Sequence, residues 1–180
     1  MPNYALMTAV GTDRPGIVSA VSGILLDADC NIEDSTMARL GGTFAIMLVL
    51  KMPEGLISRQ LHEKMKAVID EFHLWVRLED MRPEEAVEPS PENPKHLIHV
   101  YGADKKGIVH RITEHLAQQS VNITNLHTQA IHHEQPLYVM LIEVEIPPYV
   151  DVGTLHEELA AIGAELDVHV AFKPKDDARF

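Results

Sequence analysis

An internal repeat constrains the fold of this 180-residue chain more than any other feature of its sequence. The segment GTDRPGIVSAVSGILLDADCNIED in the first half aligns with GADKKGIVHRITEHLAQQSVNITN in the second. The alignment places Gly11 on Gly102 and Gly16 on Gly107. Because duplication at about half the chain length is typical of two copies of one folding unit, the repeat predicts two similar domains.

The order of elements within each half follows from hydrophobic spacing. In the first half, an apolar run at residues 4–11 precedes apolar residues at helical spacing from Ile17 to Leu25. Two strand-like segments meet at Gly41-Gly42, which is a hairpin signal. A second helical stripe and a last strand follow, so the predicted order is strand, helix, strand, strand, helix, strand.

The start of the first helix carries residues that favour helix initiation. Asp13 is the expected N-cap, and Pro15 suits the first helical turn because its missing N–H is no loss there.

A proline-rich and glutamate-rich segment separates the two halves. The stretch MRPEEAVEPSPENPK holds four prolines and four glutamates and almost no apolar residues, which is typical of an extended, solvated linker. The predicted organisation is therefore a first domain at 1–81, a linker at 82–95, a second domain at 96–173 and a polar tail at 174–180.

The doubled β-α-β-β-α-β order predicts the α+β class, with two tandem ferredoxin-like domains. Each domain is expected to bury one face of a four-stranded antiparallel sheet under two helices. The free edge of such a sheet favours pairing with another domain or another chain. We therefore expect a homodimer or a larger even assembly.

The charge of the chain argues against direct binding of nucleic acid. The net charge is −12, and neither half carries an excess of lysine and arginine over aspartate and glutamate. The single cysteine, Cys30, fits a reducing compartment. No basic region precedes the apolar start, and no apolar run approaches the roughly 20 residues that span a bilayer. These features predict a cytoplasmic protein without a membrane partner.

Histidines gather in the second half, where nine of the eleven lie, but their spacing does not favour a metal site. His96 and His99, three apart on a strand, point to opposite faces, and His110 and His115 diverge around a helix. No metal and no cofactor are therefore expected, while a pH response of the histidines stays open.

Catalytic chemistry finds little support in the sequence. No nucleophile, phosphate-binding or dinucleotide-binding motif is present. Cys30 is expected to be inert, because the dipole at a helix C-terminus raises a thiol pKa. We expect a protein that is not an enzyme.

The stretch DRPGIV…NIED resembles the ACT domain, a small regulatory module that binds amino acids. Two such domains without a catalytic domain resemble the glycine cleavage system transcriptional repressor family. The first half carries this resemblance closely, and the second more loosely, with Lys105-Lys106 where the first has Arg14-Pro15.

The resemblance implies an amino-acid site where the first strand turns into the first helix. Gly16 lets the backbone approach a ligand, and the N–H groups of the helix start attract a carboxylate. Asp13 or Asp34 would pair with the ammonium, and Asn31 would be a polar clamp. In such domains the ligand usually lies between two domains. The predicted binding residues are Asp13, Arg14, Pro15, Gly16, Ile17, Asn31, Ile32, Asp34, Asp104, Gly107, Ile108, Asn122 and Ile123.

Structural roles for two of these residues stay open. Gly16 can simply relieve crowding at a tight turn, and Asn31 can simply cap the turn into the next strand.

The predicted function is a non-enzymatic regulator that binds a small amino acid, with glycine favoured by the resemblance. It would control a partner protein, such as a DNA-binding regulator, by protein contact. The alternatives are a regulatory subunit of a metabolic enzyme and a ligand-free scaffold for dimerisation.

Overall fold

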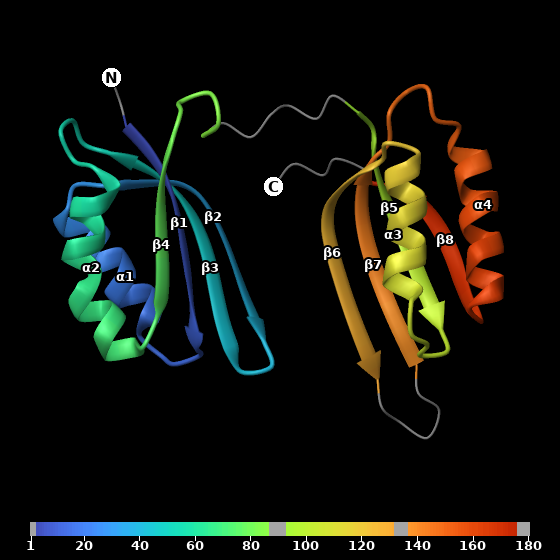
Figure 1. Ribbon diagram of the computed structural model, residues 1–180, viewed down its shortest axis with the longest axis horizontal. Helices are drawn as coiled ribbons and strands as arrows, with labels where there is room; N and C mark the ends of the chain where they lie inside the picture. The colour runs from blue at the N-terminus through green and yellow to red at the C-terminus, as the bar shows by residue number, and fades with distance from the viewer. Residues whose placement is uncertain (1–2, 87–92, 132–136, 176–180) are drawn as a thin grey trace. The chain divides into compact units, whose positions relative to one another are not determined.

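The computed structural model describes residues 3–86, 93–131 and 137–175 and divides the chain into two compact units, Met1–Glu88 and Pro89–Phe180 (Figure 1). The first unit contains β1 (Asn3–Thr12), α1 (Ile17–Asp27), β2 (Asn31–Leu40), β3 (Thr43–Met52), α2 (Ser58–Phe72) and β4 (Trp75–Met81). The second contains β5 (Lys95–Gly102), α3 (Ile108–Gln118), β6 (Asn122–Ile131), β7 (Leu137–Glu145), α4 (Val152–Glu165) and β8 (Val168–Pro174).

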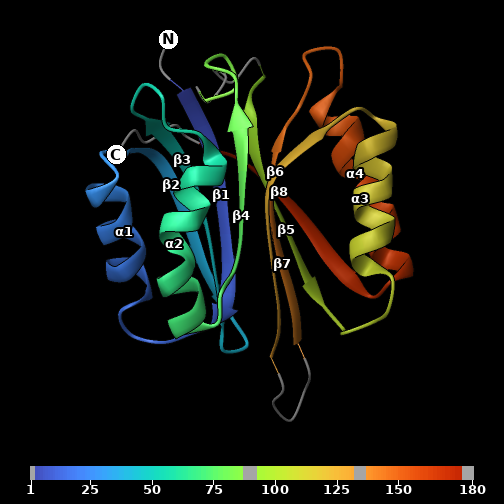
Figure 2. The same ribbon diagram turned by 60° about the vertical axis from the view of Figure 1, so that its left-hand side comes forward.

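Each unit is a four-stranded antiparallel sheet with two helices on one face. The strand order is β2-β3-β1-β4 in the first unit and β6-β7-β5-β8 in the second. Figure 2 shows α1 and α2 side by side on the same face of the first sheet. The predicted ferredoxin-like α+β fold and the predicted element order are confirmed.

Each unit has its own hydrophobic core between helices and sheet. The repeat-related helices bury the same positions, Ile17, Val21 and Leu25 on α1, and Ile108, Ile112 and Leu116 on α3. A four-residue spacing places these side chains on one face, which the sheet covers. Burial alternates along β3, so that every second side chain faces the helices.

The first helix begins later than its sequence predicts. α1 starts at Ile17, its N-cap is Gly16, and no side chain caps it. Asp13 is therefore not the N-cap, and Pro15 lies in a turn before the helix rather than in its first turn. The backbone N–H of Asp13 instead donates to the carbonyl of Gly42 (2.9 Å), which joins this loop to the β2–β3 turn.

The strands extend by one residue into the predicted linker and by one residue into the predicted tail. β5 begins at Lys95, and β8 ends at Pro174. Residues 82–86 form turns, with the Arg82 guanidinium donating to Glu85 (Nε–Oε1 2.9 Å). Residues 87–92 of the predicted linker lie outside the described residues.

Candidate ligand site

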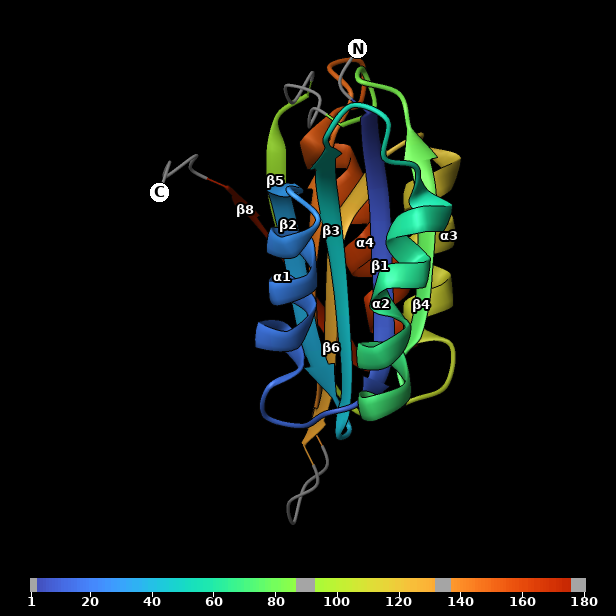
Figure 3. The same ribbon diagram turned by 90° about the vertical axis from the view of Figure 1, so that its left-hand side faces the viewer.

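The loop from β1 to α1 is held at one end of the first unit, beside the β2–β3 turn (Figure 3). Gly16 has φ +98°, a left-handed conformation that strains residues with a side chain. A Cβ at this position would lie 3.6 Å from Cζ of Phe72, the last residue of α2. The backbone therefore requires glycine here whether or not a ligand binds, which supports the structural interpretation of Gly16.

The same loop exposes backbone donors at the start of α1. The first intrahelical bond runs from the Ala20 N–H to the Gly16 carbonyl (2.8 Å), so the N–H groups before Ala20 have no partner within the helix. The repeat-related helix α3 begins in the same way, at Gly107 with φ +93° and no side-chain cap.

The other two helices start differently. In α4, the Asp151 carboxylate accepts from the Thr154 N–H (2.7 Å), and this bond lowers the pKa of Asp151. In α2, the Gln60 side chain accepts from the Ile57 N–H (3.2 Å). The free N–H groups at the repeated loops, together with the positive end of each helix dipole, can accept a carboxylate.

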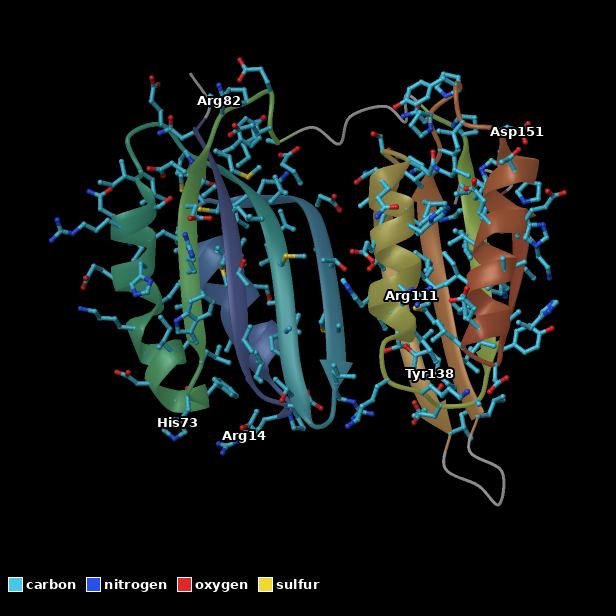
Figure 4. The ribbon with its side chains drawn as sticks, turned by 45° about the vertical axis from the view of Figure 1, so that its right-hand side comes forward. Arg14, His73, Arg82, Arg111, Tyr138 and Asp151 are labelled. Atoms are coloured by element: carbon cyan, nitrogen blue, oxygen red, sulfur yellow. The ribbon has the colours of Figure 1, made fainter. Side chains whose placement is uncertain are left out.

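The predicted site residues of the first unit fall into two groups, residues 13–17 on the loop and Asn31, Ile32 and Asp34 on β2. Asn31 pairs with Lys51, whereas the loop end of the sheet is marked by the pair of Thr12 and Thr43. The strand from Thr43 to Lys51 rises about 27 Å, longer than any free amino acid. Figure 4 labels the two ends of the unit, with Arg14 and His73 at one end and Arg82 at the other.

Gly16 and Asn31 of one unit are therefore too far apart to hold the same amino acid. The two residues are close in sequence, but α1 and the turns at its two ends carry the chain away from the loop between them. The side chain of Asn31 is exposed, and its Nδ2 donates to Oε1 of Glu33 (2.9 Å). Ile32, the next residue, lies at the same far end, opposite Leu50.

The two candidate partners for a ligand ammonium lie in different places. Asp13 stays on the loop, 3.5 Å from the Arg39 guanidinium. Asp34 follows a register shift in β2 and lies opposite Val49, on the sheet face that the helices leave open. Its Oδ1 accepts from the Ser35 N–H (2.6 Å). Asp34 therefore cannot reach a ligand at the start of α1.

The second unit repeats this geometry with more charge around the loop. Asn122 pairs with Glu145, far from the loop end at Gly102. Lys105 forms an ion pair with Asp167. Burial raises the pKa of Tyr138, a hydrogen bond with Thr128 opposes this, and the charge of Asp104 adds a smaller increase.

Both units match one known domain family. The ACT domain profile matches residues 3–79 and 96–173, which together make up most of the chain. This chain belongs to the ACT domain family.

Several relatives match this chain over almost its whole length. The glycine cleavage system transcriptional repressor of Escherichia coli is 26% identical over 169 residues, which cover 92% of this chain and 86% of that protein. An unknown protein from Galdieria sulphuraria has the same fold, with a TM-score of 0.79, 22% identity and coverage of 98% and 100% of the two chains. The structure of a candidate glycine cleavage system transcriptional repressor gives a TM-score of 0.65, 22% identity and coverage of 97% and 99%.

The histidines of the second ACT domain have separate environments. His96 and His99 pair with Val144 and Leu141, on opposite faces of the sheet as predicted. Nε2 of His115 lies 2.8 Å from Glu158. Among the described residues, no three His, Cys, Asp or Glu side chains are placed to hold a metal ion. His132 and His133 lie outside those residues.

Cys30 lies just beyond α1, and its thiol pKa is raised. The largest cause is burial, followed by the charge of Asp29, while Lys64 acts in the opposite direction. The direction is as predicted, although burial replaces the helix dipole as the main reason. No helix within the described ranges has the length and apolarity needed to cross a membrane.

Two features of the first ACT domain escaped the sequence analysis. One is Arg39, which reaches Asp13 from the end of β2 and places a cation at the loop. The other is a cavity of about 110 Å³ between α1 and the sheet. Its lining residues are Val18, Val21, Ser22, Ile32, Ser35, Phe44, Ile46 and Leu48. The available signal was the repeat, which places Ser35 where the second half has Leu126.

Proposed function

We propose that this chain is a cytoplasmic, non-enzymatic regulator that binds a free amino acid at its first ACT domain and passes the signal to a partner protein. The observation that carries this proposal is the loop before α1, where a left-handed Gly16 opens the helix start and no side chain caps it. In a family of regulatory modules, such a helix start suits the carboxylate of an amino acid.

The loop supplies both charges that a zwitterion needs. The carboxylate would accept from the N–H groups of Ile17 and Val18, at the positive end of α1. Asp13, on the same loop, would accept from the ammonium group. Arg39 already contacts Asp13, so the ammonium would share that carboxylate with a cation exposed to solvent.

Asn31 would reach this ligand from a second copy of the chain. Every residue of β2 is exposed, and β2 is the outer strand of its sheet. Two β2 strands paired antiparallel about a two-fold axis place the start of one beside the end of the other. Asn31 of one copy would then lie near Arg39 and Asp13 of the other. Such a homodimer would complete the site, because Asn31 would come from the copy whose strand start lies beside the loop.

The partner is proposed to be a protein rather than nucleic acid. The chain carries a net charge of −12, and DNA would repel a surface of that sign. The Escherichia coli relative is named a transcriptional repressor. This chain would instead control a DNA-binding protein by contact. Such a mechanism is compatible both with the relative's name and with an acidic surface.

A thermal-shift screen with the twenty amino acids tests the proposal directly. A ligand at 100 times its Kd stabilises the folded state by about 2.7 kcal/mol, and the relative's name makes glycine the first candidate. Light scattering should show a dimer or a larger even assembly at tens of micromolar. If no amino acid raises the melting temperature at millimolar concentration, the chain is a scaffold instead. A salt-sensitive DNA complex formed by the protein alone would contradict the indirect mechanism.

A further inference from the structure

The cavity under α1 extends from Val18, in the first turn of the helix, to Ile32, which lies nearer the far end of the sheet. Val18 lines the cavity and also contributes an N–H group to the first turn of α1. Two of the lining residues also reach the surface, since Val18 is 48% exposed and Ile32 is 39% exposed. A ligand with its carboxylate on the first turn can therefore direct a side chain into this space.

The walls of the cavity select against polar and charged side chains. None of its lining residues is charged, and only two carry a hydroxyl. The hydroxyl of Ser22 already donates to the Ser19 carbonyl (3.1 Å). A charged or amide side chain would lose its water here without gaining partners.

The repeat provides an internal comparison for this cavity. Ser35 lies opposite Leu48 on β3, and its counterpart in the second domain, Leu126, lies opposite Ile142 on β7. Both positions face the first helix of their own unit. Leu126 is 39% exposed and has a larger side chain than Ser35, so the two domains differ at this position beside the first helix.

We infer that the cavity accepts the side chain of a branched aliphatic amino acid, so that the first ACT domain prefers valine, leucine or isoleucine to glycine. The inference rests on the proposed function, because it uses the carboxylate position at the start of α1. A cavity of about 150 Å³ holds benzene, which has six carbons. By the same proportion, a cavity of ~110 Å³ holds three or four side-chain carbons. Burying that many carbons tightens binding on the order of 100-fold relative to glycine.

Calorimetry with valine, leucine and glycine on the full-length protein tests this inference. The decisive variant is Ser35→Leu, which copies the second domain into the first, and Leu126→Ser is the matched control. In Ser35→Leu, we expect the affinity for valine and leucine to fall to that for glycine, while glycine binding changes by less than about twofold. In Leu126→Ser, all affinities should stay unchanged. The melting temperature of ligand-free Ser35→Leu should not fall, because Leu126 shows that the fold accepts leucine there.

The outcomes separate this inference from the proposed function. If glycine binds as tightly as valine, or if Ser35→Leu keeps full affinity for valine, the inference is wrong and amino-acid binding stands. If none of the three amino acids binds the wild-type protein but another amino acid does, the cavity does not select aliphatic side chains. The inference is then wrong, and the proposed function stands. If no amino acid binds at all, the proposed function fails together with the inference.

Discussion

Replacing Gly102 with alanine is expected to destabilise the second ACT domain much more than the equivalent change at Gly11 destabilises the first. A Cβ at Gly102 would lie 2.5 Å from the carbonyl oxygen of Asp167 and 2.7 Å from Cα of Val168. Both are backbone atoms at the start of β8, and they cannot rotate away. Gly102 also has φ +156°, which a residue with a Cβ rarely adopts.

The contact at Gly11 is equally short but softer. A Cβ there would lie 2.7 Å from Cδ2 of Leu74, the end of a side chain, and the nearest backbone atom is 3.4 Å away. Overpacking a core costs about 1–3 kcal/mol. We expect a loss of about 3 kcal/mol for Gly102→Ala, which forces strand backbone apart. We expect about 1 kcal/mol or less for Gly11→Ala, because removing glycine also restricts the unfolded chain.

Denaturant unfolding followed by two signals measures both changes. Trp75, the only tryptophan, lies in β4 and reports on the first domain, whereas circular dichroism reports on both. Gly102→Ala should lower the denaturant midpoint of the second domain. Circular dichroism should detect this change, whereas Trp75 fluorescence, which reports on the first domain, should not. Gly11→Ala should shift the fluorescence midpoint slightly. Equal losses in the two variants, or a larger loss in Gly11→Ala, would refute the reasoning from backbone contacts.

Three further predictions follow from individual side chains. Asn31→Ala should weaken amino-acid binding about tenfold with little change in stability, because its exposed side chain donates to Glu33 in the same strand. Asn122→Ala should weaken binding less, and calorimetry on both variants decides this. The thiol of Cys30 should react with iodoacetamide more slowly than free cysteine at pH 8, because its pKa is raised, and denaturation should abolish the difference. The pKa of Asp151 is lowered in the folded state, so its contribution to stability is present above the ordinary value of 3.8 and is lost as pH falls through the lowered pKa. The difference in free energy of unfolding between wild type and Asp151→Ala should therefore narrow on acidification. A constant difference would contradict a stabilising role of the Asp151 carboxylate as the helix N-cap.

The sequence by itself determined the domain plan and the fold of each domain. The repeat of Gly11, Gly16 and Asn31 at Gly102, Gly107 and Asn122 indicated two copies of one unit. Hydrophobic spacing located every helix and strand to within a few residues, because the periods of a helix and a strand are local properties of the chain. The local resemblance also named the ACT family that the profile confirms.

Only the tertiary structure decided which of the site residues can act together. Gly16 and Asn31 are fifteen positions apart in sequence, yet α1 carries the chain from one end of the sheet to the other between them. The face on which Asp34 lies depended on a register shift in β2, which no local pattern specified. The cavity beside Ser35 depended on how α1 packs on two strands that are remote in sequence. Distances across a sheet and volumes beneath a helix are set by packing between elements, so they appear only when the elements are assembled.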